Sequence, residues 1–336
     1  MKRILIIEVN WLGDILFTTP AIRAVRENNP DAFISCVAVP RCVDMLKGNP
    51  HIDDIIVFDE KGRDRGIIKK LQFISILRKK RFDTVISFHR SMSRMLMAAI
   101  AGIPRRVGYY TRKRSWLLTD SVEQPIQEPH RVEYFLNITR AIGADTENKD
   151  YEFNISHGAF ENAEKILTQA GVDINEKFFI VNPGANWLPK RWPAARYGEL
   201  CKRLKDVYNV KIIITGSEKD IRLADEIIAS SENAAVSICA KTGLKELGAV
   251  MKKASLVVAN DSGPMHIAVS QKTPTVALFG PTSPDITGPY GRARYIVLNK
   301  YSECEIPCYQ LCDDYRCMEA ISVDDVMEAA DKMIER

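Results

Sequence analysis

Residues 256–284 (LVVANDSGPMHIAVSQKTPTVALFGPTSP) place a polar turn between two apolar runs, a pattern suited to a ligand that carries both phosphates and hydroxyls. Asp261 and Ser262 follow the first run, and Ser262 is predicted to be the N-cap of a short helix. The first turn of a helix has backbone N–H groups without intrahelical partners, so we expect an anion there. Gly263 lets a ligand approach the backbone, His266 lies one turn further, and the Asp261 carboxylate is suited to sugar hydroxyls. The turn predicts a sugar-diphosphate site, and a capped turn without a ligand remains the alternative.

Two other loops of the second half carry charges suited to the same ligand. Residues 182–187 (NPGANW) form a Gly-containing loop that precedes Lys190 and Arg191, and adjacent cations are suited to a diphosphate leaving group. Glu218, in the loop 215–220 (TGSEKD), is suited to holding the ribose hydroxyls of a nucleotide. The alternatives are exposed cations for the first loop and a helix-terminal acid for the second.

The loop after the first apolar run of the chain, residues 9–14 (VNWLGD), contains one glycine where a dinucleotide fingerprint needs three. A Rossmann dehydrogenase is therefore disfavoured. Asp14 is predicted to lie at the head of a helix, where its carboxylate could act as the general base for an acceptor hydroxyl. Capping of that helix is the alternative role. His89 and Arg90 are weaker candidates for the acceptor side, because a lone histidine is more often structural.

The elements that must position these residues are apolar, strand-like runs that alternate with helical segments. Runs that are apolar on both faces indicate buried parallel sheets, and we expect two doubly wound α/β domains with a cleft at the carboxyl ends of their strands. The predicted domains are 1–155 and 156–320, followed by a terminal helix within 321–336. The predicted strands are Arg3–Val9, Phe33–Val39, Ile55–Phe58, Thr84–Phe88, Val107–Tyr110, Phe178–Asn182, Val210–Thr215, Leu256–Ala259, Thr275–Phe279 and Tyr295–Leu298.

Length and composition are those of an ordinary globular protein: 336 residues, 46% hydrophobic and 27% charged. We expect a reduced cytoplasmic protein without a signal peptide or membrane span. Residues 1–155 carry 25 Lys and Arg against 19 Asp and Glu, which favours a phosphorylated glycolipid or an anionic membrane surface as a partner. Solvated charged faces are the alternative, and no nucleic-acid-binding motif accompanies the charge.

Four cysteines near the end of the chain, Cys304, Cys308, Cys312 and Cys317, have a spacing unlike paired zinc ligands. Packed thiols are the favoured interpretation, and whether they bind anything stays open. No Asp-X-Asp pair occurs in the sequence, which favours chemistry without a metal or other cofactor.

The chain resembles glycosyltransferase family 9, the bacterial lipopolysaccharide heptosyltransferases. The matching segments are VNWLGDILFTTPAIRAV, AGIPRRVGY, NPGANWLPKRWP, ITGSEKD and NDSGPMHIAVSQKTPTVALFGPTSP, in family order. The resemblance implies a GT-B fold in which the C-terminal helix returns to the N-terminal, acceptor-binding domain. It also implies inverting, metal-independent transfer of heptose from ADP-L-glycero-D-manno-heptose to the lipopolysaccharide inner core, on a lipid A–Kdo or heptosyl acceptor.

Carried over by position, Asp14 matches the proposed base, Lys190 the phosphate-binding lysine and Glu218 the ribose-binding acid of the family. Asp261 matches the acid that contacts the donor sugar, and the diphosphate turn is lined by Ser262, Gly263 and His266. Asn10 stands where many members have Ser or Thr, which leaves the acceptor identity open.

Three other functions stay open from sequence. Another sugar could be transferred, such as N-acetylglucosamine from a UDP donor, because no residue distinguishes adenine from uracil. A GT-B sugar-nucleotide epimerase would need further acid and base residues. A non-catalytic sugar-nucleotide-binding protein would be expected to lack Asp14 or Lys190, and both are present. Peripheral association with the cytoplasmic face of the inner membrane is a further expectation.

Overall fold

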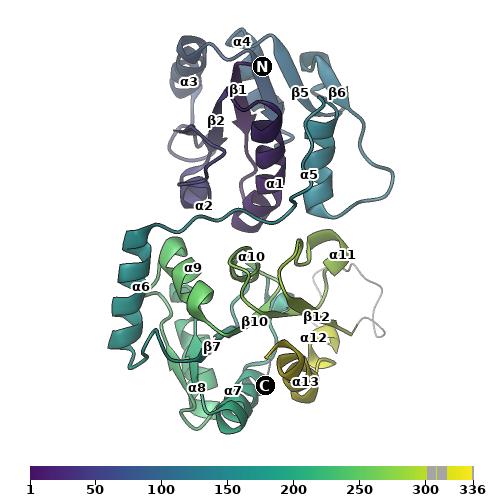
Figure 1. Ribbon diagram of the computed structural model, residues 1–336. Coiled ribbons are helices and arrows are strands. Elements are labelled where there is room, and N and C mark those ends of the chain that lie inside the picture. Colours follow the sequence, from purple (N-terminus) through teal and green to yellow (C-terminus); the bar gives the residue numbers. More distant parts are fainter. Residues whose placement is uncertain (301–307, 309–315, 335–336) are drawn as a thin grey trace. The chain divides into compact units, whose positions relative to one another are not determined.

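A computed structural model describes residues 1–300, 308 and 316–334, and it divides the chain into two compact domains, Met1–Asn154 and Ile155–Arg336. Each domain is built on a six-stranded sheet with helices on both faces (Figure 1). All strand pairings in both sheets are parallel. The predicted fold class, two doubly wound α/β domains, is confirmed.

The first domain has the strand order β3-β2-β1-β4-β5-β6. Its strands are β1 Arg3–Ile7, β2 Phe33–Ala38, β3 Asp54–Val57, β4 Thr84–Ser87, β5 Arg105–Tyr109 and β6 Asp120–Val122. Its α-helices are α1 Leu12–Asn28, α2 Val43–Leu46, α3 Ile67–Lys80, α4 Met92–Ile100 and α5 Arg131–Arg140, with 3₁₀ turns η1 Pro40–Cys42 and η2 Ser115–Leu117.

The second domain repeats this topology with the order β12-β11-β10-β7-β8-β9. Its strands are β7 Phe178–Asn182, β8 Lys211–Ile214, β9 Ala235–Ser237, β10 Leu256–Asn260, β11 Thr275–Phe279 and β12 Tyr295–Asn299. Its helices are α6 His157–Gln169, α7 Ala194–Tyr208, α8 Ile221–Ser230, α9 Leu244–Lys253, α10 Gly263–Ser270, α11 Pro284–Thr287, α12 Arg316–Glu319 and α13 Val323–Met333, with 3₁₀ turns η3 Leu188–Lys190 and η4 Glu218–Asp220.

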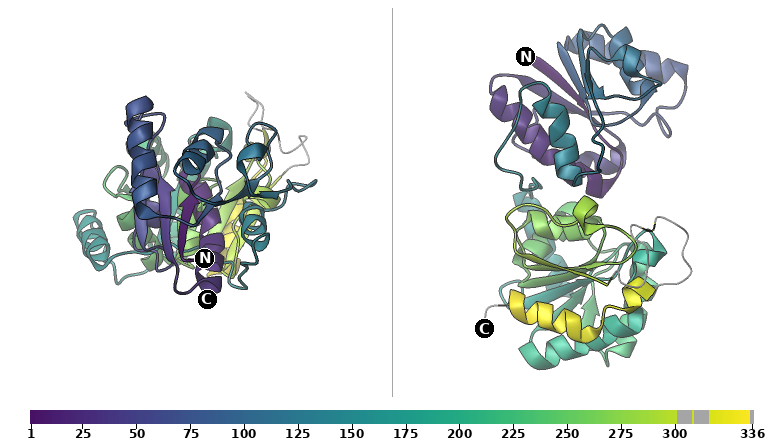
Figure 2. Two further views of the ribbon diagram at one scale, coloured as in Figure 1. Left: turned by 90° about the horizontal axis from the view of Figure 1, so that it is seen from above. Right: turned by 90° about the vertical axis from the view of Figure 1, so that its right-hand side faces the viewer.

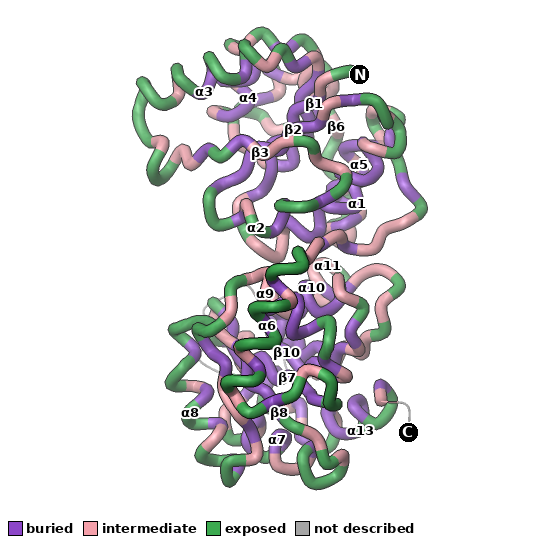
Figure 3. The backbone as a smooth tube through the Cα atoms, turned by 60° about the vertical axis from the view of Figure 1, so that its left-hand side comes forward, coloured by how far each residue is buried: buried purple, intermediate pink, exposed green. Residues whose placement is uncertain are grey.

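All ten predicted strands are present, and β7 and β11 have the predicted bounds. Every residue of β7, β10 and β11 is buried, as expected for central strands covered on both faces, and buried strands line the interior of each domain in Figure 3. Strands β6 and β9 were not predicted. Each is an edge strand of three residues with partly exposed side chains, too short to give an apolar run.

The two faces of the first sheet are covered by different helices (Figure 2). Leu5 and Ile7 of β1 point to a core that includes Phe73 of α3 and Met95 of α4. Because side chains alternate along a strand, the buried Ile4 and Ile6 point to the opposite face. There α1 and α5 lie side by side (Figure 1).

The terminal helix differs from its prediction. Helix α13 was expected to pack on the first domain, but its apolar face is part of the core of the second domain. It contacts α7, β11 and β12. Its buried residues, Val323, Val326, Met327, Ala329, Ala330 and Met333, recur every three to four positions and give a stripe that fits this surface. Arg203 of α7 also pairs with Asp324 at 2.7 Å.

Each sheet has a switch point where the chain order reverses. It lies between β1 and β4 in the first domain and between β7 and β10 in the second. Crossovers on the two sides of such a point lead away in opposite directions, so the carboxyl ends of these strands are left open for ligands. The predicted functional loops follow these four strands and their neighbours β8 and β11.

Candidate functional site

The site of the second domain is centred on Asp261, directly after β10. Its Oδ2 atom accepts hydrogen bonds from Lys190 Nζ at 2.6 Å and from Thr282 Oγ1 at 2.5 Å. Lys190 ends the 3₁₀ turn after β7, and Thr282 follows β11. Asp261 is 5% exposed, whereas the Lys190 side chain is 21% exposed. The loops after β7, β10 and β11 therefore each contribute one residue to a hydrogen-bonded cluster, in which Lys190 is the residue most accessible to solvent.

The backbone next to Asp261 is fixed by its buried neighbour Asn260. Tyr197 Oη donates to Asn260 Oδ1 at 2.8 Å, and Asn260 Nδ2 donates to the carbonyl of Pro183 at 2.8 Å. Asn260 thus ties β10 to α7 and to the loop after β7. Because the amide is buried and hydrogen-bonded on both sides, it holds the position of the Asp261 carboxylate.

Helix α10 begins directly after Asp261, as predicted. Ser262 occupies the N-cap position, but its side chain does not cap the helix: Oγ donates to the carbonyl of Asn260 at 3.2 Å. The predicted N-cap position of Ser262 is therefore confirmed, whereas the side-chain hydrogen bond typical of a serine cap is absent from this turn. Gly263 is partly exposed at the first helical position, and His266 is 3% exposed within the helix. The turn places the helix N-terminus beside the Lys190–Asp261 pair.

Arg191 has a different role from its neighbour Lys190. Its Nε donates to the carbonyl of Ala185 at 2.8 Å, and its Nη2 pairs with Asp220 at 3.2 Å. A Cβ on Gly184 would lie 2.8 Å from the Asp220 carboxyl carbon, so only glycine fits this approach of the two loops. Arg191 therefore braces the loop that carries Lys190.

Glu218 is exposed at the start of η4. The capping box of this turn is made by Ser217 and Asp220, whose side chains and backbone N–H groups are reciprocally hydrogen-bonded. Glu218 is not one of these capping residues, so its carboxylate projects from a rigid turn at the carboxyl end of β8. This location is compatible with the predicted ribose contact.

A pocket of about 450 Å³ lies at the carboxyl ends of strands in the first domain. It is lined by Asn10, Val39, Pro40, Arg41, Asp59, Glu60, Lys61, Gly62, His89, Ser91 and Arg94. Asn10 follows β1 and His89 follows β4, and Asn10 Nδ2 lies 3.1 Å from His89 Nε2. Two of the three predicted acceptor-side residues are thus brought together at the switch point.

Arg94 is the residue of this pocket that sequence reasoning missed. It is 4% exposed, and it donates from Nη2 to Asn10 Oδ1 at 3.0 Å and from Nη1 to the carbonyl of Glu8 at 3.1 Å. An arginine in the mostly apolar helix α4 was the available signal. Burial, together with the positive charges of Arg94 and Arg114, lowers the pKa of His89 to about 4, so this imidazole is neutral at pH 7.

Arg90, the third predicted acceptor-side residue, does not line this pocket. Its guanidinium donates from Nε to Tyr134 Oη at 2.9 Å and lies over the ring of the same residue, with 5.4 Å from Cζ to the ring centroid. Tyr134 belongs to α5. Arg90 therefore connects the loop after β4 to α5.

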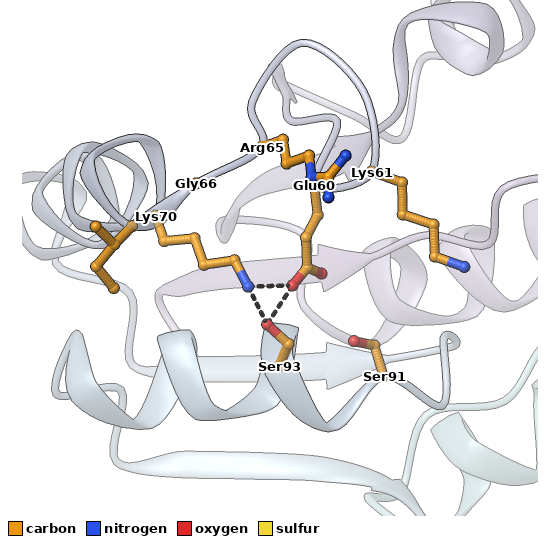
Figure 4. A pocket seen from close by; sticks show the side chains of 8 residues that line it. Glu60, Lys61, Arg65, Gly66, Lys70, Ser91 and Ser93 are labelled. Atoms are coloured by element: carbon orange, nitrogen blue, oxygen red, sulfur yellow. Dashed lines mark hydrogen bonds and ion pairs between the residues drawn. The ribbon is translucent and has the colours of Figure 1, made fainter.

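A second pocket, of about 680 Å³, adjoins the first and shares Glu60, Lys61 and Ser91 with it. Figure 4 shows Glu60, Lys70 and Ser93 converging, with Lys70 Nζ 2.8 Å from Glu60 Oε1 and 3.3 Å from Ser93 Oγ. Ser93 also donates to Glu60. Lys61 projects from the loop beside them (Figure 4). The two pockets present cations and hydroxyls together with the carboxylates of Asp59 and Glu60, a polar lining suited to a hydroxyl-rich ligand that carries negative charge.

Asp14 lies in the first turn of α1 and is partly exposed. The helix begins at Leu12, with Trp11 at the N-cap, so Asp14 is the third helical residue and not the cap. A carboxylate in a first turn is favourable with respect to the helix dipole.

Glu8, at the end of β1, was not selected from sequence. It is fully buried, with Oε2 accepting from Thr18 Oγ1 at 3.0 Å, and no partner for Oε1 exists among the residues the structure describes. Burial raises the pKa of Glu8 to about 8. At pH 7 the Glu8 carboxyl is therefore mainly protonated, and Glu8 lies next in sequence to the segment that carries Asn10 and leads into α1.

Cys304 and Cys312 lie outside the described residues. Cys308 is partly exposed, and Cys317 is buried in the core of the second domain. Within residues 1–300, 308 and 316–334, no cluster of three or more potential metal ligands occurs. In the same part of the chain, no helix is both long enough and apolar enough to cross a bilayer.

Comparison with known proteins agrees with this architecture. The family model described as glycosyltransferase family 9 (heptosyltransferase) matches residues 71–314. Lipopolysaccharide heptosyltransferase 2 of Escherichia coli strain K12 is 29% identical over 318 residues, covering 88% of each chain. The crystal structure of a family 9 glycosyltransferase from Veillonella parvula superposes with a TM-score of 0.87 at 25% identity, covering 99% of this chain and 97% of the other. The structure of E. coli ADP-heptose LPS heptosyltransferase II gives a TM-score of 0.80 at 26% identity, covering 99% and 98%.

Proposed function

This chain belongs to glycosyltransferase family 9, and we propose that it transfers heptose from ADP-L-glycero-D-manno-heptose to the inner core of lipopolysaccharide. The transfer inverts the anomeric configuration and needs no metal ion. The acceptor is a lipid A–Kdo or heptosyl glycolipid. The names of its relatives, an ADP-heptose LPS heptosyltransferase among them, support this donor and acceptor.

The observation that carries the proposal is the contact of Lys190 with Asp261 at the switch point of the second sheet. In a sugar nucleotide the diphosphate is next to the sugar hydroxyls. The Lys190 ammonium group and the Asp261 carboxylate are likewise adjacent, so one can bind the diphosphate and the other the hydroxyls. Lys190 and the N-terminus of α10 stabilise the negative charge that develops on the leaving diphosphate. Glu218 binds the ribose, and Asp261 the heptose hydroxyls.

The first domain supplies the acceptor side. Asp14 takes the proton of the attacking acceptor hydroxyl while its oxygen bonds to the anomeric carbon and the bond from that carbon to the phosphate oxygen breaks. Because this is a single displacement, ADP leaves from the face opposite to attack and the anomeric configuration is inverted. Asn10 and His89 hold the acceptor in the pocket of the first domain. His89 acts as a neutral hydrogen-bonding group, because its lowered pKa excludes it as a cation at pH 7.

Incubation with a panel of donors and acceptors tests the proposal. ADP-heptose and UDP-N-acetylglucosamine are each offered with Kdo-lipid A and with its heptosylated form, and products are identified by mass spectrometry. Addition of one heptose from the ADP donor is expected. Transfer from the UDP donor alone would replace heptose by another sugar, and release of free sugar without a glycolipid product would contradict transferase chemistry.

A further inference from the structure

We propose that helix α3 and its basic flanks form the surface by which the first domain docks on an anionic lipid bilayer. This α3 surface consists of the apolar side chains Ile67, Ile68 and Leu71 and the cations Lys61, Arg65, Lys69, Lys79 and Arg81. Ile67, Ile68 and Leu71 are 70%, 69% and 57% exposed. They occupy positions i, i+1 and i+4, so they form one continuous patch on the first two turns of the helix.

Packing within the domain does not account for this patch. Helix α3 contributes Phe73, Ile74 and Leu77 to the core, all of them buried and all C-terminal to the exposed patch. Single exposed hydrophobic side chains are ordinary on protein surfaces, but adjacent aliphatic residues that remain mostly exposed indicate an interaction site.

The charge around the patch is predominantly positive. Residues 61–81 contain nine Lys and Arg and one acid, Asp64. Lys70 and Lys80 pair with Glu60 and Asp54. The five cations of the α3 surface are exposed, and among the described residues none of them has an acidic partner. Their charge is therefore available to an external anion.

A bilayer fits this combination better than a protein partner. Protein interfaces are enriched in aromatic residues and depleted in lysine. The exposed apolar side chains of this patch are all aliphatic, and three of the five cations of the α3 surface are lysines. Aliphatic side chains can enter the boundary of the acyl chains while long lysine and arginine side chains extend to the headgroups. Each basic side chain near an anionic leaflet adds about fivefold to the binding constant.

The location of the patch adds a functional consequence that rests on the proposed function. Ile67 and Lys70 line the larger pocket of the first domain, which adjoins the pocket of Asn10 and His89. A bilayer against α3 therefore places this pair of pockets at the headgroup level. A glycolipid acceptor could then enter its pocket while its acyl chains stay in the membrane.

Co-sedimentation of the full chain with vesicles tests the docking independently of activity. Binding to vesicles of phosphatidylcholine with phosphatidylglycerol is expected to fall with added salt and to be much weaker with phosphatidylcholine alone. Ile68→Ser/Leu71→Ser should weaken binding about tenfold or more, because two apolar insertions are lost. Lys69→Gln/Lys79→Gln should also weaken binding and reduce its salt dependence. Neither pair lines either of the two pockets described above.

Ile126→Ser is the matched control, since Ile126 is a fully exposed isoleucine of the same domain outside α3. It should bind vesicles like the wild type. Equal losses in Ile126→Ser and Ile68→Ser/Leu71→Ser, or no binding by the wild type, would overturn the proposal. Concentration-dependent self-association that Ile68→Ser/Leu71→Ser abolishes, without vesicle binding, would assign the patch to a second copy instead.

Activity separates this proposal from the proposed function. Ile68→Ser/Leu71→Ser should keep wild-type transfer to a deacylated, water-soluble acceptor and lose transfer to the same acceptor in vesicles. Vesicle binding without transfer to any acceptor would leave the docking surface intact and contradict the proposed function. Equal loss with both acceptors would show that α3 acts on catalysis and not on membrane docking.

Discussion

Lys190 and Asp261, 71 residues apart in sequence, form an ion pair with 2.6 Å between Nζ and Oδ2. The lysine is predicted to bind the donor diphosphate, and the carboxylate is predicted to bind the donor sugar. The two charges neutralise each other, so a donor diphosphate that binds Lys190 competes with the Asp261 carboxylate for it.

Lys190→Ala should raise the donor Kd and lower kcat, since removing a cation from a diphosphate site typically costs about 2–4 kcal/mol. Isothermal titration with the donor and steady-state kinetics measure both effects. Lys219→Ala, which removes an exposed cation of the same domain, is the control and should change neither. Unchanged donor affinity and rate in Lys190→Ala would remove this lysine from the site.

Asp261→Asn should have opposite effects on ADP and on sugar transfer. Loss of the carboxylate releases Lys190 and removes a negative charge near the phosphates, so ADP should bind more tightly, by about 1 kcal/mol or roughly fivefold. Transfer should fall because the sugar hydroxyls lose their acceptor. Asp285→Asn, at an exposed acid in the first turn of α11, is the control. Parallel losses of ADP binding and transfer would indicate that Asp261 is only structural.

Asp14→Asn should lower kcat by about 10²–10⁴-fold, the usual contribution of general base catalysis. Donor affinity should stay nearly intact, because the proposed donor residues lie in the second domain. The melting temperature should change little, since Asp14 is not the N-cap of α1. Asp44→Asn removes an exposed first-turn acid of α2 and should keep full activity. Wild-type kcat in Asp14→Asn would end its candidacy as base.

Glu8 should make stability depend on pH. The pKa of Glu8 is about 8 in the folded protein, and the ordinary value of 4.5 applies to the unfolded chain. As pH rises, the unfolded chain therefore loses this proton before the folded protein does. Below pH 4.5 both states are protonated, and between 4.5 and 8 the free energy of unfolding falls by about 1.4 kcal/mol per pH unit. Glu8→Gln removes this dependence. Melting temperatures at pH 5.5 and 8 should therefore differ less in Glu8→Gln than in the wild type, and equal differences would contradict a protonated Glu8.

Transfer should continue in excess EDTA. This prediction rests on the missing Asp-X-Asp pair and on the provision of charge by Lys190 and the N-terminus of α10. Initial rates with and without the chelator, followed by added Mg²⁺, provide the measurement. Activity abolished by EDTA and restored by Mg²⁺ would show that a metal carries part of the leaving-group charge.

The amino-acid sequence was sufficient to predict the fold class and to locate the polar loops, because buried strands are recognised directly from continuous apolar runs. The ends of β7 and β10, and with them Asp261 and the turn at Ser262, followed from such runs. Strands β6 and β9 could not be predicted, since three residues at a sheet edge contain no apolar pattern.

The contacts between polar groups from distant segments could be established only from the three-dimensional fold. Hydrogen bonds between Lys190, Asp261 and Thr282 depend on three loops that converge at one sheet edge, and no local pattern encodes that convergence. The same holds for Arg94 beside Asn10, for Arg191 on Asp220 and for the packing of α13 on the second domain. The stripe of α13 shows that one face is buried, but an apolar stripe carries no information about which surface will cover it. Packing of distant segments supplies that choice, because complementary shape and charge exist only after the sheets have formed.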